Sequence, residues 1–290
     1  MKTSQVTFTV AISIRLDQFL AQKLSISRSK VQQLIKQRGV TLNSNICDKP
    51  STILQPNDNI RMDSVAQITE LTLIQKDIPK LRMLYEDHDI LVIDKPQGVV
   101  VHHGVKCQSG TIVDALINYD ANIKDVGEPE RPGIVHRLDK NTAGVMLIAK
   151  TNTAYEALRR QFETQQVIKK YHAMVYGDLK QDFYKLTANI GKHPQKGHLK
   201  WISNSGKSAE TQVNVIKRFN TKTLVQLTPK TGRTHQLRVH LAYLGHPIIG
   251  DPDYGPYKRA TGQELVAYLI CFRHPCTNQK ITIQRQGLEK

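Results

Sequence analysis

The side chains best suited to chemistry lie in one short segment, His136-Arg137-Leu138-Asp139-Lys140. Its only carboxylate, Asp139, follows one cation by two positions and precedes another by one. Nearby positive charge favours the ionised form of a carboxyl group, which suits a nucleophile or a base rather than a general acid. Spacing alone favours a simpler interpretation, an ordinary ion pair on the surface.

The chain around Asp139 carries the signals of a loop between strands. Asn141 to Gly144 is typical of a turn, and the apolar run 145–148 follows it. Similar runs, separated by Gly, Pro and Asp as short strands are, occur at 90–93, 98–101 and 224–227. Helical patterns are found at about 111–119, 153–164 and 234–244. We therefore predict an α+β catalytic domain over residues 81–290, with a mixed, largely antiparallel β-sheet and flanking helices.

The composition favours a nucleic-acid partner. The chain has 290 residues, of which 39% are hydrophobic, and a formal net charge of +16. This length allows one large domain and a small one, because single cores stop growing at roughly 250–300 residues. So large a positive charge favours a polyanion, since each cation that neutralises a phosphate releases a condensed counterion. Nucleic acid therefore ranks ahead of an anionic membrane surface or a simple solubility balance.

The sequence predicts a separate, small α/β domain at residues 1–66, which begins with a strand and is joined to the rest by a linker at 67–80. Two short helical patterns precede a turn and extended segments in this part of the chain. The domain has nine Lys or Arg against four Asp, a net charge of +5. The stretch from Ser27 to Gly39 has no acidic residue, and its cations are the expected contacts to RNA phosphates: Arg28, Lys30, Lys36 and Arg38.

The N-terminus and the cysteines indicate a compartment. Alternating apolar residues from Val6 to Ile14 describe a half-buried strand rather than the apolar core of a signal peptide. The sequence contains no apolar run near the ~18 residues that span a membrane. The four cysteines form no C-x-x-C pair, which is typical of a reducing environment. We expect a soluble, cytoplasmic protein without a membrane partner.

Six ordered motifs resemble those of one enzyme family. The segment from Arg131 to Thr151 is similar to the signature of the RluA family of RNA pseudouridine synthases. Further motifs of that family match the segments 86–98, 167–177, 206–211, 231–255 and 272–275. The N-terminal block resembles the alpha-L RNA-binding fold of a small-subunit ribosomal protein, through RLDQFLAQKL and SRSKVQQLIKQRGVTLN. Several motifs in the right order make a chance match far less plausible than one short pattern does.

The resemblance implies roles for individual residues. Asp139 stands at the position of the catalytic aspartate, Tyr171 at that of a tyrosine against the target base, and Arg233 at that of an arginine paired with the carboxylate. Arg137 stands where a residue helps to hold the target nucleotide out of its helix, although a plain phosphate contact is an equal alternative. Whether Asp139 attacks as a nucleophile or acts as a base at C2′ of the ribose stays open.

The reaction that the resemblance implies needs neither a metal nor a cofactor. The bond from C1′ to N1 of uracil breaks, the base rotates, and a bond from C1′ to C5 forms. The histidines do not suggest a metal site either: His235 and His240 are five residues apart, on different faces of a helix, and no Cys or carboxylate completes a ligand set. The sequence departs from the family where a histidine usually precedes an alanine, since Val266 stands before Ala267.

The substrate and the competing functions follow from the same features. An RNA-binding domain beside a catalytic domain favours a structured target, and we expect large-subunit ribosomal RNA ahead of transfer RNA. An RNA-binding assembly factor without activity would use the same charge, but it would not need the set of Asp139, Tyr171 and Arg233. A metal-dependent nuclease that uses Asp and His is disfavoured by the missing ligand spacing. We expect a monomer.

Overall fold

The computed structural model describes residues 5–24, 28–63, 78–104, 107, 109–257 and 262–288. Within helix α2 the side chains of Lys30 and Arg38 also lie outside the described part. Contacts divide the chain into two compact units, Met1–Lys76 and Asp77–Lys290, each of which has its own core. The two units are therefore described one at a time.

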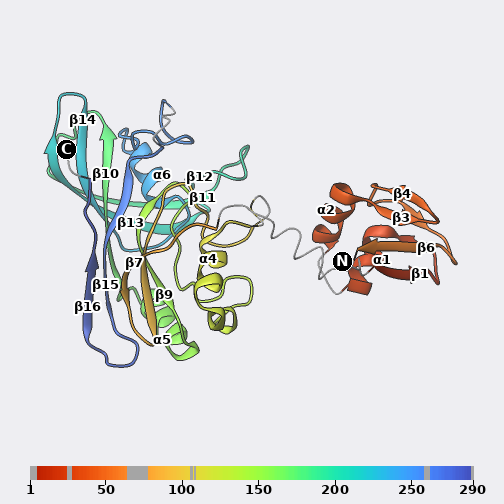
Figure 1. The fold of residues 1–290 in the computed structure, drawn as a ribbon. Helices are drawn as coiled ribbons and strands as arrows, with labels where there is room; N and C mark the ends of the chain where they lie inside the picture. Colours follow the sequence, from red (N-terminus) through yellow and green to blue (C-terminus); the bar gives the residue numbers. More distant parts are fainter. Residues whose placement is uncertain are drawn as a thin grey trace. The chain divides into compact units, whose positions relative to one another are not determined.

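The first unit combines two helices with two small sheets (Figure 1). A four-stranded antiparallel sheet has the order β1-β6-β3-β4, and β2 pairs with β5. Its elements are β1 (Gln5–Thr9), β2 (Ile14–Arg15), α1 (Leu16–Leu24), α2 (Arg28–Arg38), β3 (Val40–Leu42), β4 (Asn45–Cys47), β5 (Ile53–Leu54) and β6 (Asn59–Asp63). The apolar residues that recur at helical spacing in α1 and α2 meet in one core with the inner residues of β3, β5 and β6.

A buried carboxylate fastens the two helices of this unit together. The side chain of Asp17, at the start of α1, is fully buried. It accepts hydrogen bonds from Arg15, from Arg28 Nε at 3.0 Å and from Gln32 Nε2 at 2.6 Å. The hydrogen bond from Arg15 is the largest of the effects that lower the pKa of Asp17, and they outweigh the effect of burial. Arg28 and Gln32 belong to α2, so this cluster sets how α2 lies on α1.

The second unit is built on one large sheet with the order β12-β11-β13-β14-β10-β15-β9-β8-β7, and β16 pairs with β15. All of these pairs are antiparallel except the parallel pair of β9 with β15, so the predicted α+β class with a mixed, largely antiparallel sheet is confirmed. The strands are β7 (Arg82–Glu86), β8 (Ile90–Lys95), β9 (Ala143–Ala149), β10 (Ile168–Tyr176), β11 (Phe183–Lys192), β12 (Lys200–Ile202), β13 (Lys207–Arg218), β14 (Lys222–Pro229), β15 (Leu265–Arg273) and β16 (Lys280–Gln284).

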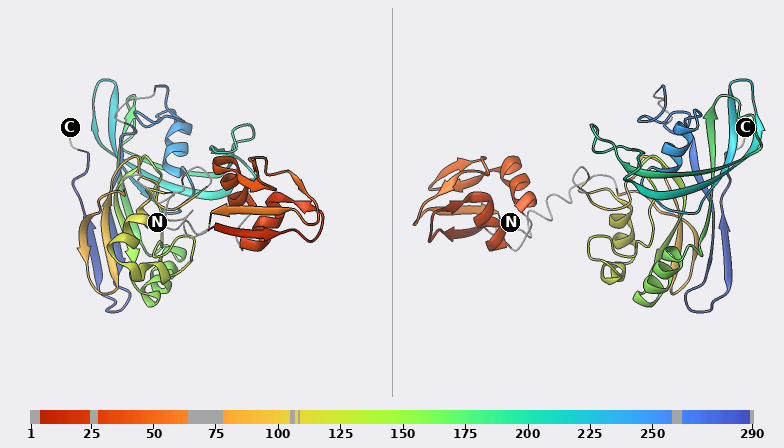
Figure 2. Two further views of the ribbon diagram at one scale, coloured as in Figure 1. Left: turned by 45° about the vertical axis from the view of Figure 1, so that its right-hand side comes forward. Right: turned by 180° about the vertical axis from the view of Figure 1, so that it is seen from behind.

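The helices lie against this sheet at two places. Figure 2 shows α4 and α5 toward one end of the unit and α6 toward the other. They are α4 (Ile112–Tyr119), α5 (Asn152–Glu163) and α6 (Gln236–Tyr243), and a 3-10 helix, η1 (Ala121–Asp125), follows α4. These bounds confirm the three helical patterns in the sequence. Thr111 and Asp114 form a capping box at the start of α4, and Thr151 caps α5, which explains why each helix begins where it does.

One strand prediction was wrong. The run 98–101 forms a loop, because other groups use its backbone carbonyls. The Val99 carbonyl accepts from the Lys95 ammonium, and the Val100 carbonyl accepts from the N–H of Ile112 at the start of α4. None of the helices in the described ranges is long and apolar enough to cross a membrane.

Candidate active site

The structure brings the residues predicted for catalysis into one cavity. It measures about 100 Å³ and is lined by Asp139, Tyr171 and Arg233. Asp139 lies on the loop before β9, Tyr171 on β10, and Arg233 on the loop between β14 and α6. Arg137, which is exposed, lines the same cavity. Residues nearly a hundred positions apart in the chain therefore surround a space of the size of a small ligand group.

A fully buried lysine holds the loop that carries Asp139. Lys95, at the end of β8, donates hydrogen bonds from Nζ to the carbonyls of Pro96, Val99 and Lys140 at 2.8–3.1 Å. Gly98 N–H donates to the same Lys140 carbonyl at 2.9 Å. Burial lowers the pKa of Lys95 to about 8, and the negative charge of Asp139 acts in the opposite direction. The residue after the carboxylate is thus fixed to the neighbouring loop.

The other end of this loop is fixed by backbone packing. Gly144 has φ +125°, a conformation that L side chains rarely adopt. A Cβ atom at this position would overlap the backbone of Ala267 on β15. The parallel pair of β9 with β15 needs this close approach, since Gly144 is paired with Ala267 there. A glycine is therefore required where the loop enters β9.

The arginine that faces Asp139 differs from the one expected. Arg238 Nη1 lies 3.7 Å from Asp139 Oδ2, whereas Arg233 Nε donates to the carbonyl of Ser208 at 3.0 Å. No ion pair joins Arg233 to Asp139 among the residues that the structure describes. Arg233 is exposed, and the Arg238 side chain is only 5% exposed. The buried cation opposite the carboxylate is therefore Arg238, five residues further along the chain.

Acidic residues on the next loop hold Arg238 in place. Its Nε and Nη2 each donate to Asp251 at 2.7 Å, and Nη2 also donates to Asp253 at 2.6 Å. Its guanidinium carbon lies 4.9 Å from the centre of the Tyr254 ring. Burial acts to lower the pKa of Arg238, but the hydrogen bonds and charges of Asp251 and Asp253 raise it above its ordinary value. Arg238 is thus a permanent, fixed cation at the wall of the cavity.

One signal in the sequence could have identified Arg238. It stands in the middle of a helical pattern between Leu237, Val239 and Leu241. A charged residue within an apolar helix is buried only when it has a partner, so it indicates a buried ion pair. The family motif at 231–255 contains both Arg233 and Arg238, so residue types alone do not separate the two arginines.

Tyr171 presents a neutral phenol to the cavity. It is 8% exposed and belongs to the central core cluster. Burial raises its pKa well above the ordinary value, and the charge of Asp139 raises it further. The phenol therefore keeps its proton at neutral pH. Lys169, two residues earlier on β10, lines the same cavity, and burial lowers its pKa.

His136 belongs to the catalytic segment by sequence but has a structural role. Its Nε2 accepts the N–H of Leu147 on β9 at 2.9 Å, and its ring stacks on Phe162 of α5 at 4.8 Å between centroids. Burial is the main cause that lowers its pKa to about 3, and Lys169 adds to it. The neutral ring of His136 therefore links the segment that carries Asp139 to β9 through this hydrogen bond.

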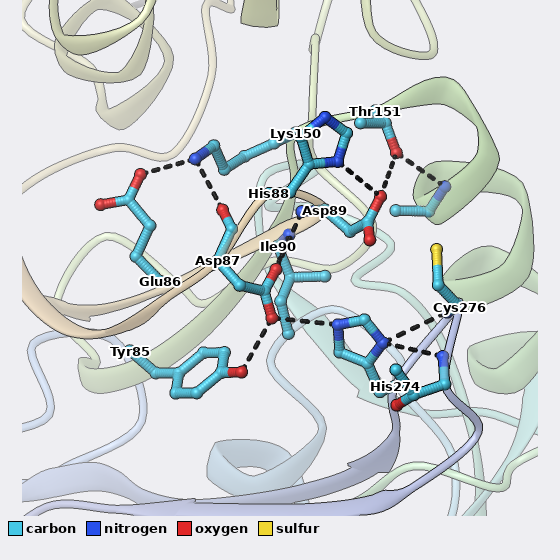
Figure 3. A network of polar contacts seen from close by, with 12 residues as sticks. Tyr85, Glu86, Asp87, His88, Asp89, Ile90, Lys150, Thr151, His274 and Cys276 are labelled. Carbon is cyan, nitrogen blue, oxygen red and sulfur yellow. Dashed lines mark hydrogen bonds and ion pairs between the residues drawn. The ribbon is translucent and has the colours of Figure 1, made fainter.

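A group of potential metal ligands lies away from the cavity. Ligand atoms of Asp87, Asp89 and His274 lie within 4.8 Å of one another. Figure 3 shows that hydrogen bonds within the protein already occupy them. His274 Nε2 lies 3.0 Å from Asp87 Oδ2, its Nδ1 accepts two backbone N–H groups, and Asp87 accepts from Tyr85 and from two backbone N–H groups. This network fastens the β7–β8 turn to the end of β15 and does not fit a metal site.

The predicted RNA contacts of the first unit have different outcomes. Arg28 is engaged in the ion pair with buried Asp17, so part of its function is structural. Lys36 is exposed on α2, as a phosphate contact requires. The side chains of Lys30 and Arg38 lie outside the described part of the structure.

Comparisons with known proteins agree with this architecture. A family model described as RNA pseudouridylate synthase matches residues 89–243, more than half of the chain, and a model of the S4 domain matches residues 14–60. The solved structure of human RNA pseudouridylate synthase domain containing 1 has a TM-score of 0.60 at 24% identity and covers 74% of this chain and 86% of its own. This last similarity shows the fold alone.

Two curated relatives are similar over almost the whole chain. An RNA pseudouridine synthase named as uncharacterized, from Aquifex aeolicus (strain VF5), is 40% identical over 274 residues, 90% of this chain and 86% of the relative. Ribosomal large subunit pseudouridine synthase D from Escherichia coli (strain K12) is 37% identical over 274 residues, 93% of this chain and 82% of the relative. The chain therefore belongs to the RluA-type RNA pseudouridine synthases and carries an N-terminal S4 domain that binds RNA.

Proposed function

We propose that Asp139 is the essential catalytic carboxylate of this RNA pseudouridine synthase and that its substrate is large-subunit ribosomal RNA. The observation that carries the first part is the geometry of the cavity. A carboxylate there faces the buried, fixed guanidinium of Arg238 and shares the space with a buried aromatic ring, Tyr171. A protein that only binds RNA needs no such carboxylate in a basic cavity.

Different residues of the cavity have different roles in the isomerisation. The C1′–N1 bond of uridine breaks, the uracil turns within the cavity, C5 bonds to C1′, and the proton lost from C5 is balanced by one that N1 gains. Asp139 acts as the nucleophile or as the base at C2′, and the guanidinium of Arg238 holds its carboxylate in position. The raised pKa of Tyr171 disfavours a role as the base at C5 and favours packing of its ring against uracil.

The target base must first leave its stack, at a cost of a few kcal/mol unless it already lies in a loop. Arg137 is exposed and lines the cavity, so it is suited to occupy the space that the base leaves. Arg233 is also exposed there, and its free guanidinium nitrogens are suited to contact RNA. We therefore assign Arg233 to substrate binding rather than to the pairing with Asp139.

The choice of ribosomal RNA is supported by two findings. Relatives that match 93% of this chain over 82% of their own length are named ribosomal large subunit pseudouridine synthase D. The S4 domain adds a second RNA-binding surface, which a structured target can fill. Transfer RNA is the alternative substrate, and both can be offered to the enzyme in one experiment.

The test uses the full-length protein and unmodified transcripts of large-subunit ribosomal RNA and transfer RNA, with a chelator present. We expect pseudouridine in the ribosomal transcript without a change of mass, and none with Asp139→Asn, which keeps the size of the side chain and removes its charge. Turnover by Asp139→Asn at the wild-type rate would refute the assignment. Chain cleavage would indicate a nuclease, unaltered bound RNA an assembly factor, and modified transfer RNA the other substrate.

A further inference from the structure

A second cavity opens on the other side of Arg137. It measures about 80 Å³, and Arg137 is the residue that it shares with the active-site cavity. Three arginines and His102 line it, together with Ile134, Val135, His136 and Tyr155. Among the described residues no Asp or Glu lines it, so all of its charged lining groups are cations. A cavity of this kind has room for several water molecules or a phosphate group.

Two elements supply the arginines. Arg131 and Arg137 lie on the loop between η1 and β9, and Arg159 lies on α5. Cations that converge on one cavity without a carboxylate in its lining repel one another there. Such a lining is therefore typical of a site that receives negative charge.

Carboxylates outside the cavity fix two of these arginines. Arg131 donates from Nε and Nη2 to Glu128 at 2.7 and 2.9 Å. Arg159 lies 3.5 Å from Glu156 and 3.4 Å from Glu163, one turn away on either side of α5. A guanidinium has five N–H donors, so each of these pairs leaves others unused. The ion pairs hold the side chains in place without filling the cavity.

His102 offers a further donor. Its buried Nδ1 has no hydrogen-bond partner among the residues that the structure describes. Burial lowers the pKa of His102, and the charges of Arg137, Arg131 and His103 lower it further, so the ring is neutral at neutral pH. In the tautomer with its proton on Nδ1, the ring can donate to an anionic oxygen, which would remove the unsatisfied buried group.

We infer that this cavity binds a phosphodiester group of the RNA strand next to the target uridine. The inference rests on the proposed function, and it adds Arg131, Arg159 and His102 to the substrate contacts. Because Arg137 lines both cavities, the two sites are one side chain apart. A phosphate held there fixes the backbone beside the target nucleotide while its base is in the active site, and so sets which nucleotide enters.

The first test compares two neighbouring arginines of α5 in the full chain. Arg159 lines the cavity, whereas Arg160 is exposed and does not line it. With an RNA fragment that contains the converted uridine, we expect Arg159→Ala to raise the Kd about tenfold. The slope of log Kd against log salt should fall by about one, the loss of one phosphate contact. Arg160→Ala should change the Kd by less than about twofold, because its exposed charge lies outside the cavity and is screened by salt.

The second test identifies the phosphate. A neutral methylphosphonate replaces the linkage on the 5′ or the 3′ side of the target uridine, in two separate RNAs. We expect one of them to weaken binding by the wild-type protein about as much as Arg159→Ala does, and to cause no further loss in that variant.

Each result has a definite meaning. Equal losses from Arg159→Ala and Arg160→Ala, or full affinity for both modified RNAs, would overturn the inference, because the cavity would then bind a free anion or nothing. A wild-type protein that binds the RNA but makes no pseudouridine would refute the proposed function, while the two binding tests would still decide whether the cavity receives a phosphate.

Discussion

At the scale of single residues, the contrast between Arg233 and Arg238 is the most informative. Both carry the same group and both line the active-site cavity. Arg233 is exposed and bonds to one backbone carbonyl, whereas Arg238 is buried and bonds to two carboxylates besides facing Asp139. A fixed, desolvated guanidinium aims a carboxylate, and an exposed one is free to meet the substrate.

This contrast predicts different kinetic effects of the same substitution. Arg238→Lys loses the planar fork that Asp251 receives, so we expect kcat to fall about 10- to 100-fold, with a smaller change in KM for RNA. Arg233→Lys should raise KM more than it lowers kcat. Steady-state assays measure kcat and KM of both variants, and thermal melting confirms that the variants are folded. If kcat falls strongly in Arg233→Lys and not in Arg238→Lys, the result would support the pairing of Arg233 with Asp139 that the sequence predicts.

At the scale of elements, the loop that carries Asp139 is held from several directions. Lys95 binds it from the end of β8, Gly144 lets it approach β15, and His136 ties it to β9 and α5. Catalytic carboxylates need a fixed geometry, and a loop supplies it only when its neighbours over-determine its position. The histidine of the catalytic motif is therefore part of the support of the site.

The depressed pKa of His136 predicts acid sensitivity of this support. The unfolded chain takes up a proton below about pH 6.5, and the folded protein does so only below about pH 3. Between these values the unfolded state binds more protons, so the free energy of unfolding falls as the pH falls. We expect the titration of His136 to lower the free energy of unfolding by about 2 kcal/mol between pH 7 and pH 5.

Urea unfolding at the two pH values measures this loss. The only tryptophan of the chain, Trp201, lies in the second unit and reports on it alone. In His136→Gln the amide oxygen can accept the Leu147 N–H, and the side chain does not titrate. Between pH 7 and pH 5 the free energy of unfolding of this variant should therefore fall by about 2 kcal/mol less than that of the wild type. An equal loss in wild type and variant would show that His136 is not the group that titrates.

At the scale of the whole molecule, the chain consists of two units with separate cores. The chain carries a net charge of +16, and the S4 domain and the catalytic unit each have exposed cations. RNA binding should therefore be shared between the units and should weaken with salt. Every residue that lines the candidate active-site cavity belongs to the second unit, so we expect the chemistry to depend on that unit.

Because the two units have separate cores, we expect each of them to unfold independently of the other. Asp17→Asn removes the charge with which Arg15 and Arg28 pair, and because both arginines are partly exposed we expect a cost of only about 1 kcal/mol. We expect the first unit to unfold more readily and RNA affinity to fall, while the Trp201 transition stays unchanged. Asp48→Asn, at an exposed position of the same unit, is the matched control. Limited proteolysis and RNA binding measure both effects, and a shifted Trp201 transition would show that the units are coupled.

Much of the fold and the site follows from local sequence patterns. Helical periodicity and caps predict α4, α5 and α6 to within about two residues, since those signals lie inside each element. The order of the family motifs predicts that Asp139 and Tyr171 share a site, and the cavity brings them together. The prediction of a strand at 98–101 was wrong, because Lys95 and the start of α4 donate hydrogen bonds to the carbonyls of this segment. Those donors are brought to the segment by the tertiary structure.

The sequence by itself determined the class of enzyme, the presence of an RNA-binding unit and the identity of the carboxylate in the site. The tertiary structure decided which arginine faces that carboxylate. His235 has φ 58° at the start of α6, so the chain turns sharply between Arg233 and Arg238. That turn leaves the first outside and carries the second inward to Asp251. Spacing along the chain does not reveal such a turn, because a left-handed residue is stabilised by its surroundings rather than by its own preference.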